Sequence, residues 1–214
     1  MSSPRKRIVV LISGRGSNLA ALLDAAGAPD YPARVCAVIS NRADAAGLDY
    51  ARRAGVSARV IAHGDYSSRE QFDDALRHAI EEFAPDLVVL AGFMRVLTSG
   101  FVQHFLGRLL NIHPSLLPNY KGLNTHQRAI DDRAKIHGAT VHFVSPDVDG
   151  GAAIIQAAVP VEANDTATTL AERVLEQEHV ILPLAVRWFA EGRLYLRGNA
   201  VFMDGNVLEQ PIRL

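Results

Sequence analysis

Four short apolar runs constrain the fold of this chain more than any other feature. They lie at residues 8–12, 35–39, 87–90 and 109–112. None shows the alternation of polar and apolar residues that is expected of a strand with one solvent-exposed face. Strands of a parallel sheet are covered by helices on both faces, and for that reason they read as continuous hydrophobic runs. The four runs therefore predict buried parallel strands.

Patterns of helical period fill the intervals between these runs. Apolar residues recur at helical spacing over 19–26 and over 72–83, and Ser67 with Glu70 predicts a capping box before the second of these helices. Two further strands are predicted in the second half of the chain, over residues 136–144 and 152–159. Alternation of strands and helices in this way is typical of the α/β class.

The length and composition of the chain fit one globular domain. A chain of 214 residues, 49% of them hydrophobic, can bury a sizeable core, and no repeat or Pro/Gly/Ser-rich linker divides it. We expect a disordered tail over 1–6 and a single domain over 7–214, with an open, mostly parallel, twisted sheet and helices on both faces. The formal net charge of -1 gives no field that would attract nucleic acid or a membrane surface.

The single cysteine, Cys36, excludes an internal disulfide and fits a reducing cytosol. Because no apolar stretch is long enough for a signal peptide core or a membrane span, we expect a cytoplasmic protein. The sequence does not decide between a monomer and a homodimer. Seven of the eight histidines show no spacing typical of zinc ligands, so we expect no metal. They are His63, His78, His104, His126, His137, His142 and His179.

A glycine-rich segment, Ser-Gly-Arg-Gly-Ser-Asn at 13–18, follows the first strand and opens a helix. Free backbone N–H groups and the helix dipole favour a phosphate there. Leu19 stands where the dinucleotide fingerprint has its third glycine, and the second strand is not followed by a ribose-binding acid. The segment thus predicts a site for a small monophosphate, with Ser17 and Asn18 as side-chain donors. A tight turn that needs glycine only for backbone reasons is the alternative.

Asn111 and His113 alternate with apolar residues at the end of the fourth run. Their spacing of two residues puts both side chains on one face of a strand. Ligands of open parallel sheets bind beyond the carboxyl ends of the strands, so both polar groups should face a ligand crevice. The alternative is a capping asparagine and a hydrogen-bonded core histidine, which explains either residue alone better than it explains the pair.

Residues 111–118, Asn-Ile-His-Pro-Ser-Leu-Leu-Pro, strongly resemble the motif of the folate-dependent formyltransferases. Other segments resemble the same family, and within it the branch that formylates glycinamide ribonucleotide; they are residues 10–18, 90–95, 148–151 and 177–179. The resemblance spans nearly the whole chain. It implies a Rossmann-like formyltransferase fold with a phosphoribosyl-binding N-terminal half and a folate-binding, catalytic C-terminal half.

The resemblance also implies an activity: transfer of the formyl group of 10-formyltetrahydrofolate, as co-substrate, to the amine of glycinamide ribonucleotide in purine (IMP) synthesis. Asn111, His113 and Asp149 become the catalytic trio. Asn111 and protonated His113 can donate hydrogen bonds to the oxyanion. A nearby Asp149 would favour the charged imidazole and position a water for proton transfer. Thr140 could hold that water, although an ordinary strand residue is the preferred interpretation.

Binding roles follow from the same resemblance. The residues implied for the phosphoribosyl group are Gly16, Ser17, Asn18 and Glu178. The residues implied for the folate are Arg69, Met94, Arg95, Val96, Leu97, Asn111, Ser145, Asp147 and Val148. Without the resemblance, Glu178 and Arg69 would be interpreted as solvated surface charges. The segment 119–125 departs from many relatives, which have proline before Gly122 and histidine near Asn124.

Three other functions compete with this hypothesis. Methionyl-tRNA formyltransferase shares the trio but has a basic C-terminal module for RNA, for which this chain is too short. Formyltetrahydrofolate deformylase has an N-terminal regulatory domain that we do not find here. A non-catalytic regulator that binds a phosphosugar would explain the glycine segment, but it gives no reason for Asn111, His113 and Asp149.

Overall fold

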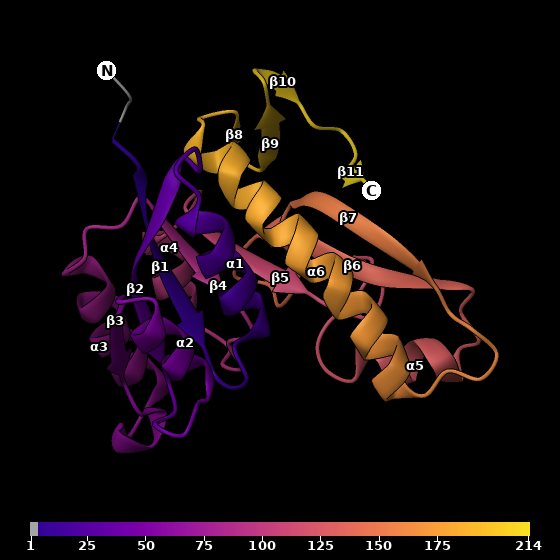
Figure 1. Cartoon of the computed structure of the whole chain (residues 1–214), viewed down its shortest axis with the longest axis horizontal. Coiled ribbons are helices and arrows are strands. Elements are labelled where there is room, and N and C mark those ends of the chain that lie inside the picture. The colour runs from indigo at the N-terminus through magenta and orange to yellow at the C-terminus, as the bar shows by residue number, and fades with distance from the viewer. Residues whose placement is uncertain (1–3) are drawn as a thin grey trace. The chain divides into compact units, whose positions relative to one another are not determined.

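The computed structural model describes residues 4–214 (Figure 1), and these divide into two compact units with the boundary between residues 110 and 111. Residues 1–3 of the expected tail lie outside the described part, and strand β1 already begins at Lys6. The expectation of one domain over 7–214 stays a prediction.

The first unit is built on parallel strands in the order β4-β1-β2-β3. Its elements are β1 (Lys6–Ile12), α1 (Ser17–Gly27), β2 (Ala33–Ser40), α2 (Gly47–Arg53), β3 (Ser57–Val60), the 3-10 helix η1 (His63–Asp65), α3 (Arg69–Glu81), β4 (Leu87–Leu90) and α4 (Ser99–His104). Every residue of β4 is buried, as are the last five of β1, which explains why both read as unbroken apolar runs.

The start of α3 corrects one detail of the sequence analysis. The N-cap is Ser68, whose side chain accepts a hydrogen bond from the backbone N–H of Gln71. Ser67 instead donates to the side chain of Gln71. Either of two adjacent serines can cap a helix in isolation, so the choice depends on where the chain turns into the helix.

The second unit contains strands in the order β11-β7-β6-β5, and β5 crosses the division between the units. Its elements are β5 (Leu109–His113), α5 (Thr125–Asp131), β6 (Ile136–Phe143), β7 (Ala153–Pro160), α6 (Ala167–Ala190), β8 (Leu194–Arg197), β9 (Ala200–Met203), β10 (Asn206–Val207) and β11 (Ile212–Arg213). β6 and β7 are antiparallel, whereas the pairs β1–β2, β1–β4, β2–β3 and β7–β11 are parallel. The predicted α/β class with a mostly parallel sheet is confirmed.

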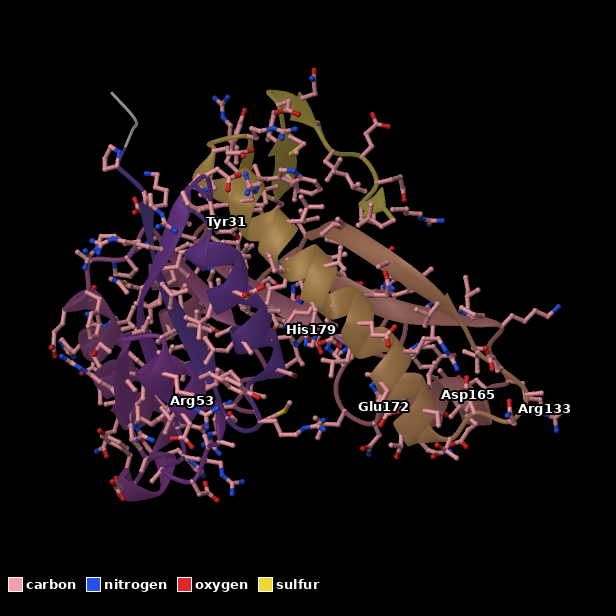
Figure 2. The ribbon with its side chains drawn as sticks, viewed as in Figure 1. Tyr31, Arg53, Arg133, Asp165, Glu172 and His179 are labelled. Atoms are coloured by element: carbon pink, nitrogen blue, oxygen red, sulfur yellow. The ribbon has the colours of Figure 1, made fainter. Side chains whose placement is uncertain are left out.

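The long helix α6 packs against β6 and β7 (Figure 1). Thr166 caps it in a capping box with Thr169. Asp165 lies just before the cap (Figure 2), and its Oδ2 forms an ion pair with Nη1 of Arg173 at 2.8 Å. The helix continues through Pro183 and buries Leu170, Val174 and Ile181, the apolar stripe that faces the sheet. Among residues 4–214, none of the helices has the length and apolar character that crossing a membrane requires.

A buried histidine on β6 makes the stability of the protein depend on pH. Burial and the neighbouring His126 lower the pKa of His137 from 6.5 to about 4. Between these values the unfolded chain binds a proton that the folded chain does not, so the free energy of unfolding falls as the pH drops from 6.5 to 4. We expect His137→Gln to reduce that slope by up to about 1.4 kcal/mol per pH unit in urea unfolding series. A variant with an unchanged slope would contradict the assignment.

Candidate active site

The end of β5 delivers two polar side chains to the same face. Asn111 and His113 are separated by Ile112, so their side chains point the same way. His113 is only 6% exposed and Asn111 is half-buried. A buried imidazole requires hydrogen-bond partners, and these come from two different loops.

The first of these loops, residues 144–152, joins β6 to β7 and carries Asp149 in a left-handed conformation with φ 47°. Such backbone is sparsely populated by non-glycine residues and persists only where surrounding contacts hold it. Gly151 provides one such contact, because a Cβ on this residue would overlap the backbone carbonyl of Phe143. The Asp-Gly-Gly sequence therefore has a physical role: it lets the loop pass close to the end of β6 and aim the carboxylate inward.

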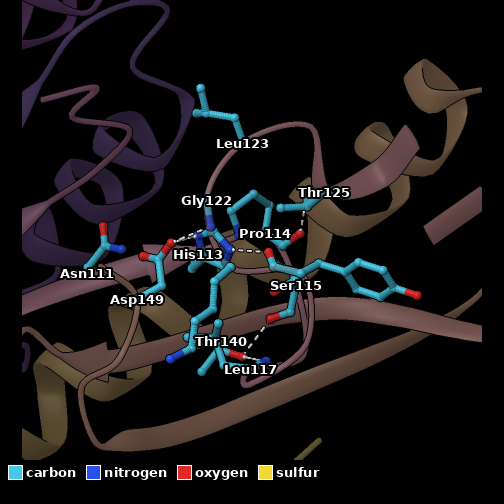
Figure 3. Close-up of polar contacts among 12 residues, drawn as sticks. Asn111, His113, Pro114, Ser115, Leu117, Gly122, Leu123, Thr125, Thr140 and Asp149 are labelled. Carbon is cyan, nitrogen blue, oxygen red and sulfur yellow. Dashed lines mark hydrogen bonds and ion pairs between the residues drawn. The ribbon is translucent and has the colours of Figure 1, made fainter. Parts of the chain in front are cut away.

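The carboxylate of Asp149 meets the imidazole of His113 (Figure 3). Its Oδ2 lies 3.3 Å from Nδ1 of His113, and it also accepts a hydrogen bond from the backbone N–H of Gly122 at 2.9 Å. On the other side of the ring, Nε2 lies 3.0 Å from the carbonyl oxygen of Tyr120. Both ring nitrogens thus face acceptors, and only an imidazolium can donate to both.

A second buried histidine, His142 on β6, lies between Asn111 and Asp149 and contacts both. Nδ2 of Asn111 lies 3.1 Å from Nε2 of His142, which in turn is 3.8 Å from Oδ1 of Asp149. Burial lowers the pKa of His142 to about 4, so its ring is neutral near pH 7. The structure therefore brings Asn111, His113 and Asp149 into one cluster, and it adds a residue to which the sequence analysis gave no role.

Thr140, two residues before His142 on β6, uses its hydroxyl for hydrogen bonds within the protein and not for a catalytic water. Its hydroxyl donates to the carbonyl of Ser115 at 2.6 Å and accepts from the backbone N–H of Leu117 and from Gln156. These contacts use the donor and both lone pairs of the hydroxyl. Thr140 thus anchors the chain that follows β5, in keeping with the preferred structural interpretation.

The loop of residues 119–124 closes over the imidazole. Tyr120, Gly122 and Asn124 all have positive φ, and Asn124 takes the N-cap position of α5. Arg128 holds the loop by donating to the carbonyl of Lys121 at 2.7 Å. Asn124 tolerates the left-handed conformation better than most residues do, which accounts for the asparagine at this departure from the family pattern.

In the first unit, the glycine segment forms the turn from β1 into α1. Gly16 has φ 77° and occupies the N-cap position, and the carbonyl of Gly14 accepts from the backbone N–H of Gly47 at 3.0 Å. A Cβ on Gly16 would lie 2.5 Å from Cα of Gly47. This position therefore requires glycine for backbone reasons, and the N-cap residue makes no side-chain hydrogen bond to the first turn of α1.

Ser13 ties this turn to the segment after β4. Its hydroxyl accepts from the backbone N–H of Met94 at 2.7 Å and donates to Asn41 at 2.6 Å. Neither Ser13 nor Gly47 was assigned a role from sequence. The contacts of Ser13 could have been suspected from sequence, because Ser13 and Asn41 are polar residues directly after buried strands. No sequence pattern indicates that Gly16 and Gly47 lie close together.

The residues implied for folate and ribose fall in both units. In the first unit, Met94 and Val96 are exposed although apolar, Leu97 is buried, and the guanidinium of Arg95 lies 6.0 Å from the ring centroid of Phe72. Arg69 is an exposed residue at the start of α3. In the second unit Val148 is an exposed apolar residue, Ser145 donates to the carbonyl of Asp147 at 3.2 Å, and Glu178 is 7% exposed, which excludes a solvated helix charge.

Three comparisons with known proteins concern the chain as a whole. The model of the formyl transferase family matches residues 6–186. A phosphoribosylglycinamide formyltransferase of Escherichia coli is 52% identical over 201 residues, which cover 94% of this chain and 95% of that protein. The human trifunctional purine biosynthetic protein adenosine-3 is 51% identical over 195 residues, 91% of this chain and 19% of that protein. The structure of the phosphoribosylglycinamide formyltransferase of Coxiella burnetii has a TM-score of 0.94 at 46% identity and covers 99% of this chain and 100% of that chain. This chain belongs to the formyl transferase family.

Proposed function

We propose that this chain transfers the formyl group of 10-formyltetrahydrofolate to the amine of glycinamide ribonucleotide, giving formylglycinamide ribonucleotide and tetrahydrofolate. The chain is an enzyme of the formyltransferase class, like relatives of about half identity over most of its length. The observation that carries the mechanism is the 3.3 Å contact between Asp149 and His113, in one cluster with Asn111.

The reaction requires stabilisation of negative charge on the formyl oxygen. The amine of the acceptor attacks the formyl carbon, a C–N bond forms, and the C=O electrons move to oxygen; the bond to the folate nitrogen then breaks. An N–H of Asn111 and the imidazolium of His113 are the donors for that oxygen. In the structure Nε2 of His113 faces the Tyr120 carbonyl, so the formyl oxygen would take the place of this carbonyl.

Asp149 has two functions in this mechanism. Its Oδ2 lies 3.3 Å from Nδ1 and can accept a hydrogen bond from it, which orients the ring whose other nitrogen faces the developing oxyanion. It also accepts, through a water, the proton that the attacking nitrogen must lose. The leaving folate nitrogen takes up a proton as the tetrahedral intermediate collapses. No enzyme nucleophile is needed, because the acceptor amine forms the bond itself.

The substrates are held by features that suit their chemistry. The αL glycine and uncapped first turn of α1 suit the phosphate, and the buried carboxylate of Glu178 suits the ribose hydroxyls as an acceptor. Exposed apolar side chains at Met94, Val96 and Val148 suit the faces of the pterin. We place this enzyme in the cytoplasm because its one cysteine, Cys36, fits a reducing compartment.

A parallel assay of acceptors tests the proposed function. The protein is supplied with 10-formyltetrahydrofolate and with glycinamide ribonucleotide, initiator methionyl-tRNA or water alone, and the formylated product and tetrahydrofolate are quantified. We expect product with the ribonucleotide, and a rate lower by at least about 10³ with the other two, since a site with buried polar groups discriminates strongly against ligands that leave those groups unpaired. Turnover with water alone, or with the tRNA alone, would assign the chain to another branch of the family.

A further inference from the structure

A buried histidine that the mechanism above does not use contacts two members of the trio. His142 is 1% exposed on β6, with Nε2 placed 3.1 Å from Nδ2 of Asn111 and 3.8 Å from Oδ1 of Asp149. Its other nitrogen, Nδ1, lies 2.9 Å from the carbonyl oxygen of Phe143. Both ring nitrogens of this buried imidazole therefore face polar groups, and one of these groups belongs to Asn111.

The contact with Phe143 determines where the proton of this ring is. A backbone carbonyl can only accept, so Nδ1 of His142 must carry the hydrogen. In a neutral imidazole Nε2 is then a bare acceptor, and the group it faces on Asn111 must be a donor. The amide of Asn111 is thereby fixed with its nitrogen, not its oxygen, toward the ring.

The same tautomer settles how Asp149 is shared. The carboxylate lies between two imidazoles, with Oδ2 at 3.3 Å from His113 and Oδ1 at 3.8 Å from His142. A hydrogen on Nε2 of His142 would attract the carboxylate away from His113 and would point at the Asn111 amide nitrogen. The buried, neutral ring avoids both effects and leaves the carboxylate to His113.

We propose that His142 is a positioning residue, which holds the Asn111 amide so that its second N–H, and not its oxygen, faces the formyl oxygen. The role in catalysis rests on the proposed function; the orientation of the amide does not. An asparagine free to rotate would present its oxygen to the developing negative charge in part of the population, and preorganisation is what makes an oxyanion donor effective.

A double-mutant cycle measures this dependence. We expect His142→Leu to lower kcat about 30-fold, less than the 10²–10³ typical of removing an oxyanion donor outright, with KM for both substrates changed less than about threefold. His142→Gln, whose side-chain oxygen can accept from Asn111, should recover kcat to within about fivefold of the wild type. In an Asn111→Ala background, His142→Leu should cost less than about threefold, because no amide is left to position.

Several results would overturn the proposal. Equal losses from His142→Leu with and without Asn111 would show a merely structural role, as would a glutamine variant no better than the leucine variant. A matched control is His137→Gln, which removes a buried imidazole from the same strand and should leave kcat within about threefold. Ring ¹⁵N NMR of the wild-type protein is independent of turnover: a proton on Nε2 instead of Nδ1 refutes the orientation, whereas a correct tautomer in a protein without formyl transfer refutes only the proposed function.

Discussion

Replacing His113 by alanine is expected to lower kcat for formyl transfer by about 10³. In the proposed mechanism the imidazole of His113 donates a hydrogen bond to the oxyanion, and the loss of such a donor typically costs 10²–10³ in rate. KM should change little, because the contact forms only as charge develops on the formyl oxygen. Steady-state kinetics with glycinamide ribonucleotide, with circular dichroism to verify folding, provides the measurement.

His104→Ala is the matched control for His113→Ala. His104 pairs with Glu81 at 2.6 Å in the first unit and belongs to no proposed site, so its loss should leave kcat unchanged. Asp149→Asn should lower kcat by a factor similar to that of His113→Ala, and the double variant by little more, because the two side chains act as a unit. A folded His113→Ala protein with wild-type turnover would exclude the proposed mechanism.

The strands were predictable because a strand that is buried on both faces consists of a continuous run of apolar residues. Each of the four apolar runs, 8–12, 35–39, 87–90 and 109–112, falls within a strand, and the two strands predicted for the second half are β6 and β7. The short helices α2, α4 and α5 were not predicted. Helices of six or seven residues offer too few turns for a periodic pattern, and packing rather than propensity stabilises them.

The candidate site could be predicted only in part. Two-residue spacing at the end of a buried strand places Asn111 and His113 on one face, and this follows from strand geometry alone. Asp149 entered only through family resemblance, since no local pattern shows which strand a distant loop will approach. The part played by His142 depends on the pairing of β6 and on the location of one proton, and neither is encoded in the spacing of residues.

Replacing Gly151 by alanine is expected to lower kcat at least about 100-fold and to reduce the free energy of unfolding by about 3 kcal/mol. The added Cβ would overlap the Phe143 carbonyl and would stand 3.0 Å from the backbone nitrogen of Ser145. Backbone atoms cannot rotate away as a side chain can, so either the carbonyl or the loop must move. The carbonyl fixes the tautomer of His142, and the loop carries Asp149, so either movement disturbs the trio.

Two measurements separate this local effect from the general cost of a methyl group. In Gly100→Ala the new Cβ meets nothing within 4 Å, so this variant should keep the kcat of the wild type, and its urea midpoint should stay the same or rise slightly because alanine favours the helix α4. Gly151→Ala should lose kcat even at temperatures where it is fully folded, because displacing a catalytic group by about 1 Å is enough to cost two orders of magnitude. Should Gly151→Ala match Gly100→Ala in both measurements, the close approach of the loop to the end of β6 could not be what positions Asp149.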